Sequence, residues 1–245
     1  MREYYYDFHI HSVLSPCGDE DNTPNNLAGM ASLSGLDIVA LTDHNTAKNC
    51  PAFIKACEKY GILALAGMEL TTSEDIHVVC LFERLNDALN FDTFVNDNRF
   101  KIKNRPEIFG EQLILDENDE VIGKEEYLLT SASNISVSDI ADTVKNFGGV
   151  AFPAHIDREA NGIIAVLGDL PKNEGFVFFE LNDREKVKEY TEKYGIDEKN
   201  ILIGSDTHNL AAMRDKENCF YLKSEPFDKE ALKKELFTLL RGDGI

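Results

Sequence analysis

The sequence is short of basic residues, of cysteine and of long hydrophobic runs. Its 25 lysines and arginines are outnumbered by 44 acidic residues, which gives a formal net charge of −19. Such a surface repels polyanions and argues against broad binding of nucleic acid or of an acidic membrane. A small phosphorylated substrate stays compatible with this charge if bound metal reverses the local field. The simplest role of the charge is to keep the protein soluble.

The five cysteines are odd in number and form no Cys-x-x-Cys pair. Three of them lie inside predicted helices or strands, so we expect free thiols in a reducing compartment and no disulfide framework. No apolar run approaches membrane-spanning length, and no cationic segment followed by an apolar one opens the chain. We therefore expect a cytoplasmic protein without a membrane partner.

The hydrophobic pattern alternates between segments of strand length and segments of helix length. The first predicted strand runs to His11. The others are 36–42, 62–70, 76–82, 150–154, 175–181, 201–204 and 219–222. The predicted helices are 51–60, 183–194 and 228–240, with others between Thr23 and Gly35 and from Ser136 to Gly148. This alternation predicts an α/β fold with a mostly parallel sheet that is able to close into a barrel.

A single domain is expected over residues 1–245, because a barrel of this length has one core. Residues 84–132 break the alternation and are rich in charged and amide side chains. Their low apolar density predicts an insertion within the domain, without a core of its own. Two short apolar stretches flank Asp116–Asp119, which predicts a β-hairpin with a polar turn.

Residues able to bind metal follow the predicted strands, in most cases at the carboxyl end. In parallel α/β folds these ends line the active site. His77 is the exception because it opens its strand, so either that strand runs antiparallel or the preceding loop reaches the same mouth. The residues at carboxyl ends are His9, His11, Asp43, His44, Glu69, His155, Glu180, Asn182, Asp206 and His208.

All six histidines of the chain lie in these segments, and none lies on a predicted outer helix. His9 and His11 are two residues apart, so on an extended segment both rings point to the same side. Any one histidine taken alone fits a core or surface role equally well. Together, six imidazoles and several carboxylates are too many for one four-coordinate ion. We therefore predict two or three divalent ions, with a carboxylate such as Glu69 bridging them.

Five segments in this order resemble the PHP domain (polymerase and histidinol phosphatase) family of metal-dependent phosphoesterases. They read DFHIHSVLS, ALTDHN, GMELTT followed by HVVCLF, PAHIDR and GSDTHN, and they span residues 7–209. The resemblance implies a distorted (β/α)7 barrel and a trinuclear centre of zinc, manganese or iron. The implied ligand sets are His9, His11, Glu69 and Asp206 for the first ion, Glu69, His77 and His155 for the second, and His44 and His208 for the third.

Family members usually add a third-site ligand from the loop after the His-x-His pair. In this chain we assign Asp19, with Glu20 or Cys17 as alternatives. A Cys17 thiolate is a soft ligand that suits zinc, although a small buried residue at this position needs no such role.

The resemblance predicts hydrolysis of a phosphoester by a metal-activated hydroxide. Clustered divalent cations lower the pKa of bound water and neutralise charge on the phosphate oxygens. No serine or cysteine nucleophile is then needed, and the sequence has neither a Gly-x-Ser-x-Gly nor a P-loop motif. We assign Glu69, Asp206 and His208 to catalysis.

Two further residues have assigned roles around this centre. Arg158 is the predicted ligand of the substrate phosphate, with a surface pair to Glu159 as the alternative. Asp43 is expected to orient His44 or a metal-bound water from outside the ligand set, or to be a plain turn residue.

The preferred substrate is a small phosphomonoester, nucleotide-like or histidinol-phosphate-like, and we expect no long nucleic acid. Phe109 or Tyr127 of the insertion is a candidate for stacking on a base. The alternatives are a phosphodiesterase or exonuclease acting on short oligonucleotides, and a non-catalytic metal-binding PHP module. An amidohydrolase uses similar ligands but more usually has a lysine at a strand end, which is absent from these segments.

Overall fold

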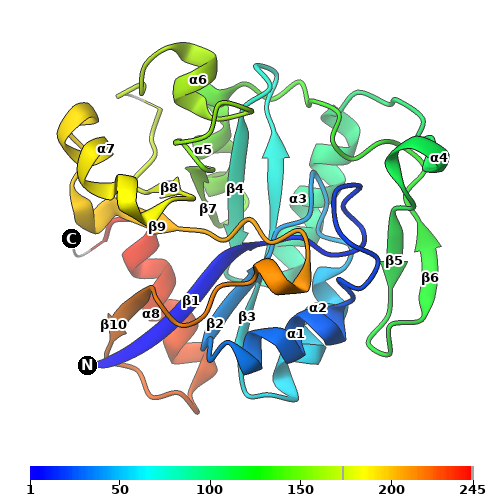
Figure 1. Ribbon diagram of the computed structural model, residues 1–245, viewed down its shortest axis with the longest axis horizontal. Coiled ribbons are helices and arrows are strands. Elements are labelled where there is room, and N and C mark those ends of the chain that lie inside the picture. The colour runs from blue at the N-terminus through cyan, green and yellow to red at the C-terminus, as the bar shows by residue number, and fades with distance from the viewer. Residues whose placement is uncertain (173, 244–245) are drawn as a thin grey trace.

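The computed structural model describes residues 1–172 and 174–243, which form a mixed α/β fold around one curled sheet (Figure 1). The strands are β1 (Arg2–Ile10), β2 (Ile38–Leu41), β3 (Leu63–Thr71), β4 (His77–Phe82), β5 (Leu113–Leu115), β6 (Val121–Lys124), β7 (Gly149–Pro153), β8 (Phe179–Leu181), β9 (Ile201–Ile203) and β10 (Cys219–Leu222). The helices are α1 (Pro24–Leu33), α2 (Cys50–Glu58), α3 (Leu85–Asn98), α4 (Pro106–Phe109), α5 (Val137–Asn146), α6 (Ile163–Leu167), α7 (Val187–Tyr194) and α8 (Lys229–Leu240). Short 3-10 helices occupy Arg184–Lys186, Glu198–Asn200 and Leu210–Ala212.

The main sheet has six strands in the order β10-β1-β2-β3-β4-β7, and it is not mostly parallel as expected from the sequence. β1, β2 and β3 run parallel, whereas the pairs β10–β1, β3–β4 and β4–β7 are antiparallel. Residues 72–76 alone join β3 to β4, and a parallel pair needs a crossover of about a dozen residues or more. The fold is therefore a six-stranded half-barrel with the parallel pair β8–β9 beside it, where the resemblance implies seven βα units.

The hairpin β3–β4 explains the position of His77. Because β4 runs antiparallel to β3, its first residue pairs with the last residue of β3, Thr71. His77 thus lies at the same edge of the sheet as Glu69, as the antiparallel alternative requires.

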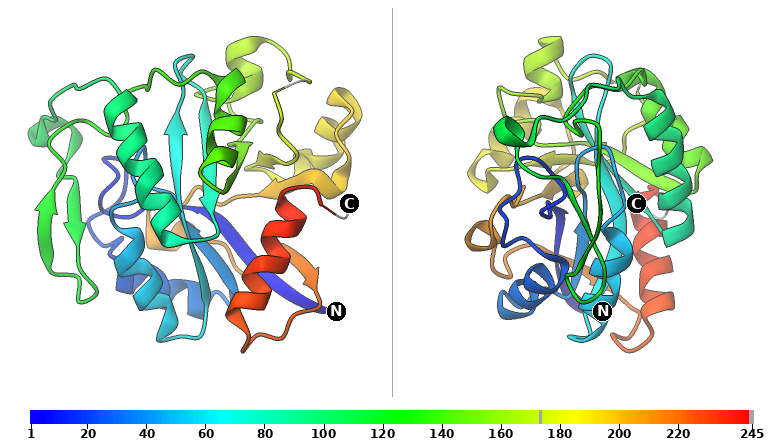
Figure 2. Two further views of the ribbon diagram at one scale, coloured as in Figure 1. Left: turned by 180° about the vertical axis from the view of Figure 1, so that it is seen from behind. Right: turned by 90° about the vertical axis from the view of Figure 1, so that its right-hand side faces the viewer.

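Two apolar cores cover the two faces of the sheet. Helices α1, α2, α3 and α5 pack on one face, and α8 covers the other with Leu232, Leu236, Phe237 and Leu240 (Figure 2). On β3, Leu63, Leu65 and Glu69 alternate onto the face of the α8 core, because side chains two apart on a strand share a face. Glu69 is therefore buried above an apolar floor.

The segment 84–132 begins with a regular helix that the sequence pattern did not indicate. α3 buries Ala88, Phe91 and Val95 in the main core, while its asparagines and aspartates lower the apolar density of the segment. After Asn98 the chain is irregular except for α4 and the antiparallel pair β5–β6 on either side of Asp116–Asp119.

The helices are short or polar in comparison with membrane-spanning segments. Within the part of the chain that the structure describes, no helix is both long and apolar enough to cross a bilayer.

Candidate metal centre

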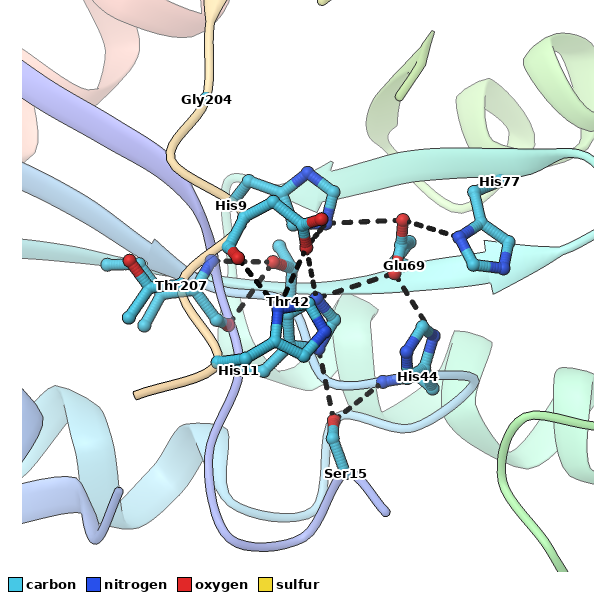
Figure 3. Close-up of polar contacts among 12 residues, drawn as sticks. His9, His11, Ser15, Thr42, His44, Glu69, His77, Gly204 and Thr207 are labelled. Carbon is cyan, nitrogen blue, oxygen red and sulfur yellow. Dashed lines mark hydrogen bonds and ion pairs between the residues drawn. The ribbon is translucent and has the colours of Figure 1, made fainter. Parts of the chain in front are cut away.

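The side chain of Glu69 lies at the centre of a cluster of histidines (Figure 3). Five imidazoles have a ring nitrogen within 3.4 Å of a Glu69 oxygen: His9 at 3.2 Å, His11 at 3.4 Å, His44 at 3.0 Å, His77 at 2.8 Å and His155 at 3.0 Å. The sixth histidine, His208, stacks on His11 with 4.6 Å between ring centroids. Residues spread over 200 positions of sequence thus meet at one point.

Backbone geometry brings these side chains together. His9 is the penultimate residue of β1 and His11 follows the strand, while a parallel bridge joins His44 to Glu69. His155 and Asp206 both have left-handed backbone, with φ of 29° and 52°. Residues other than glycine rarely adopt this conformation, and such strain gathers at functional sites.

Three groups of ligand atoms lie within 4.8 Å of one another. They are His9, His11, Glu69 and Asp206; His44, Glu69 and His77; and His11, His44 and His208. The first group has the membership that the resemblance implies for the first ion. The second group contains His44 and lacks His155, which the resemblance implies for the second ion, although His155 contacts Glu69 at 3.0 Å. The third group contains His11 in addition to the implied His44 and His208.

Several buried ligand atoms in these groups lack a hydrogen-bond partner. Among the residues that the structure describes, Nε2 of His9, Nδ1 of His44 and Oε2 of Glu69 are buried and make no hydrogen bond, although Nε2 of His9 lies 3.2 Å and Nδ1 of His44 3.0 Å from a Glu69 oxygen. A buried polar atom without a partner costs about 1–3 kcal/mol. Lone pairs that converge in this way suit divalent cations, so the residues present fit a metal cluster.

The charges in the cluster favour cations at its centre. Burial alone would raise the pKa of Glu69, but the imidazoles of His77 and His9 hold it well below its usual range. Burial likewise opposes charge on His9, yet the carboxylates of Glu180, Glu69 and Asp206 raise the pKa of its imidazole. Positive charge is therefore stabilised between these carboxylates.

His44 and His208 have the opposite electrostatic environment. Burial lowers the pKa of His44 well below its usual value, and it also lowers the pKa of His208. Both rings are therefore neutral near pH 7, which is the protonation state that binds metal.

Glu180, which the sequence suggested only as a strand-end residue, orients His9. Its carboxylate accepts a hydrogen bond of 2.7 Å from Nδ1 of His9, and it also accepts one from the backbone N–H of His155. Because this contact holds a proton on Nδ1, Nε2 is the ring nitrogen that would give up its proton to bind a metal. A Cβ on Gly204 would overlap with this carboxylate, so glycine is required beside it. Only the position of Glu180 near the carboxyl end of a strand could have indicated this role.

Asp43 acts on His11 through a serine. Its carboxylate accepts hydrogen bonds from the backbone and hydroxyl of Ser12 and from the hydroxyl of Ser15, each at 2.7 Å. Ser15 Oγ in turn lies 3.1 Å from Nδ1 of His11 and accepts the backbone N–H of His44. Asp43 thus fixes the loop Ser12–Ser15, which contacts His11 and His44, and does not itself contact either imidazole ring.

The remaining predicted residues lie at the rim. Asp19 is exposed, and its carboxylate accepts a hydrogen bond from the backbone of Asp21; in the described ranges it belongs to none of the three ligand groups. Arg158 forms an ion pair with Asp206 and lines a pocket of about 310 Å³ over the cluster. Cys17 and Thr130 line the same pocket. The assignment of all these residues as ligands or substrate contacts stays a prediction.

The fold resembles those of several solved hydrolase structures. The chain has a TM-score of 0.65 to a lesion-specific endonuclease from Pyrococcus furiosus, with 19% identity, covering 99% of this chain and 57% of the endonuclease. It has a TM-score of 0.57 to a putative metal-dependent phosphoesterase from Bifidobacterium adolescentis, with 20% identity, 84% of this chain and 88% of that one. An amidohydrolase from Chromobacterium violaceum gives a TM-score of 0.56 at 18% identity, over 94% and 96%. At these identities the likeness concerns the fold.

A curated relative supports the likeness over a short stretch. An uncharacterized protein of Methanocaldococcus jannaschii is 32% identical over 76 residues, which are 28% of this chain and 44% of the relative. The chain thus covers less than two thirds of both this relative and the endonuclease.

The family model for the PHP domain matches residues 7–195. This range is more than half of the sequence, and it contains the predicted ligands from His9 to His155. The chain therefore belongs to the PHP domain family.

Proposed function

We propose that this protein is a metal-dependent phosphoesterase that hydrolyses a small phosphomonoester, nucleotide-like or histidinol-phosphate-like. The observation that carries the proposal is the convergence of buried histidine nitrogens on the Glu69 carboxylate, where Nε2 of His9, Nδ1 of His44 and Oε2 of Glu69 make no hydrogen bond with any residue that the structure describes. Family membership supports hydrolysis as the chemistry of such a pocket.

The proposed centre holds two or three ions of zinc, manganese or iron. Its ligands would be His9, His11, Glu69, Asp206, His77, His155, His44 and His208, with Asp19 as a candidate for the third site. When bound, such ions activate water and neutralise charge on the phosphate oxygens. Glu69 would bridge, because its two oxygens face different groups of imidazoles.

The side chains of the protein have three tasks in this scheme. Glu180 and the Asp43–Ser15 pair hold His9 and His11 in fixed orientations. Arg158 stands at the rim, where its guanidinium can exchange Asp206 for a substrate phosphate. The Nδ1 of His208 contacts the carbonyl oxygen of Asp206 at 2.7 Å, so Nε2 is the ring nitrogen left for the reaction.

The catalytic unit in this proposal is the single domain, 1–245, and residues 84–132 shape access to the pocket. Thr130 of that segment lines the pocket directly, which supports a role in substrate selection.

A second candidate is hydrolysis of a phosphodiester in a short oligonucleotide. The likeness in fold to an endonuclease over 99% of the chain favours it, and a structure of such an endonuclease with duplex DNA has a TM-score of 0.64. The net charge of −19 weighs against long nucleic acid.

The test is to measure bound metal in the purified protein and then phosphate release with Mn²⁺ or Zn²⁺. The panel contains phosphomonoesters, bis(p-nitrophenyl) phosphate and short oligonucleotides. We expect at least one retained or restorable ion per chain, and a loss of activity of about a hundredfold or more in His9→Ala and Glu69→Ala. Glu58→Ala, an exposed glutamate on α2, is the control.

Two outcomes contradict the proposal. A chain that neither retains nor regains metal has no cluster. Metal binding without release from any ester, in wild type and variants alike, identifies a non-catalytic binding module.

A further inference from the structure

A second groove opens beside the metal pocket. It lies between the loop after β1 and helix α4, has a volume of about 420 Å³, and is lined by Pro16, Cys17, Ile108, Phe109, Gly110 and Thr130. Cys17 and Thr130 also line the metal pocket. Figures 1 and 2 show α4 next to the blue loop in each view. The two cavities, the metal pocket and this α4 groove, therefore adjoin at Cys17 and Thr130.

The α4 groove offers an aromatic ring with a cation against it. Phe109 is partly exposed, and the guanidinium of Arg105 lies 5.8 Å from its ring centroid. Ile108 adds an apolar side chain that is 56% exposed. A flat aromatic ligand stacks on such a ring, and this arrangement of aromatic and arginine side chains is typical of sites that bind nucleobases.

The segment that leads into α4 is cationic in an otherwise acidic protein. Residues 99–106 read RFKIKNRP, with four basic residues and no acidic one. Arg99 is buried and paired with Glu125 at 2.7 Å, whereas Lys101, Lys103 and Arg105 are exposed. Local positive charge of this kind attracts phosphate although the chain as a whole repels polyanions.

Backbone pairing holds this cationic segment at the edge of the groove. Bridges join Arg99 to Ser133 and Lys103 to Tyr127, in antiparallel orientation. The partner stretch 127–133 contains Thr130, which lines both cavities. The backbone of the cationic segment is thus held next to the stretch that contains Thr130, and the Lys103 ammonium lies 3.9 Å from the exposed carboxylate of Glu126.

We infer that the α4 groove binds the nucleoside part of the substrate, with its base on Phe109 and a neighbouring phosphate at Arg105 and Lys103. The inference rests on the proposed function, because it identifies the group attached to the phosphate that is hydrolysed. The groove accommodates a nucleotide or a dinucleotide, and acidic surface elsewhere disfavours a longer strand.

The experiment compares two monoesters on the Mn²⁺-loaded full chain: 5′-phosphorylated dithymidylate and phenyl phosphate. In Phe109→Ala and Arg105→Ala, kcat/KM for the dinucleotide is expected to fall about tenfold, while kcat/KM for phenyl phosphate changes less than twofold. Phe100→Ala and Arg84→Ala are matched controls, since both residues are exposed and neither lines the groove. Equal effects on both substrates, or equal effects of Phe100→Ala and Phe109→Ala, overturn the inference.

A binding measurement separates this inference from the proposed function. Fluorescence anisotropy with labelled dithymidylate is recorded without added metal, so that no hydrolysis is required. Weaker binding by Phe109→Ala and Arg105→Ala supports the assignment of the groove even if the metal-loaded wild type hydrolyses no ester. The absence of hydrolysis would contradict the proposed function alone. Binding that is unchanged in both variants overturns the groove assignment even if phosphate release is robust.

Discussion

At the scale of single residues, the orientation of His9 depends on one carboxylate. In Glu180→Gln the amide oxygen keeps the shape of the acceptor but loses its charge, so the basicity of Nε2 falls. We expect metal affinity to decrease about tenfold, at the lower end of the effect of residues that hydrogen-bond a metal ligand. Competition with a chromophoric chelator measures the change.

Glu185→Gln is the control for this experiment, because Glu185 is exposed on the neighbouring 3-10 helix. A role of Glu180 in the fold alone would lower the Tm of the metal-free protein and leave the Kd for metal unchanged.

Gly204 tests the same contact from the other side. Its Cβ position is taken by the Glu180 carboxylate, so Gly204→Ala must displace that side chain or the strand end. We expect a loss of about 1–3 kcal/mol in the free energy of unfolding, together with weaker metal binding. Urea unfolding measures the change in the free energy of unfolding. Gly123→Ala is the control, since the nearest atom there is 3.5 Å from the added Cβ; equal losses in both variants would contradict the steric explanation.

At the scale of elements, one buried carboxylate docks the segment after α3 onto the barrel. Glu125 pairs with Arg99 at 2.7 Å and with Lys48 of the loop after His44. Glu125→Gln leaves Arg99 buried without its counter-charge, and we expect a loss of about 3 kcal/mol in unfolding free energy. Glu126→Gln is the matched control: that carboxylate is exposed and 3.9 Å from Lys103, so its loss is expected to stay below about 0.5 kcal/mol.

The Glu125 pair also predicts a dependence on pH. Burial opposes ionisation of Glu125, but the hydrogen bond and charge of Lys48, with the charge of Arg99, lower its pKa below the usual value of 4.5 for a glutamate. A carboxyl group with a depressed pKa in the folded state stabilises the fold above its unfolded pKa and loses this effect as pH falls through the folded pKa. The stability difference between wild type and Glu125→Gln should therefore be constant above about pH 5.5 and shrink on acidification. A difference that grows below pH 4.5 would contradict this sign.

The local hydrophobic pattern of the sequence predicts some structural features correctly and misses others. The period of two in β1 and the strand-end rule brought His9, His11, His44, Glu69 and Asp206 together correctly in space, because both follow from backbone geometry. The length of the 72–76 connection could have indicated the β3–β4 hairpin. Helix α3 was missed because its buried residues are separated by asparagines and aspartates.

Side-chain pairing in three dimensions was beyond sequence reasoning. The contacts of Asp43 with Ser15, and of Glu180 with His9, join residues 28 and 171 positions apart. Asp19 was chosen by its distance along the chain from His11, whereas its backbone folds back to bond with His208 and its carboxylate is exposed.

At the scale of the whole molecule, bound metal is expected to contribute to stability. Nε2 of His9, Nδ1 of His44 and Oε2 of Glu69 are buried without a hydrogen bond to the described residues, and a bound cation would supply the missing partner. At metal concentrations of about a hundred times Kd, this contributes about 2.7 kcal/mol, which for this chain length is a Tm change of about 5–10 °C. Calorimetry before and after chelation, followed by restoration of Mn²⁺ or Zn²⁺, measures it. Glu69→Ala should show no such change in Tm. A wild-type Tm that stays the same after chelation would contradict the presence of a metal cluster.

The pairing of β1 with β10, side by side in Figure 1, has a consequence for how the protein is made. The ribosome releases His9 long before Asp206, and at about 5–20 residues per second the interval of 197 residues takes about 10–40 s. During that time β1 lacks its partner β10, and the proposed first-ion site lacks Asp206. The nascent chain therefore carries an incomplete set of donors from the synthesis of His9 until Asp206 is added.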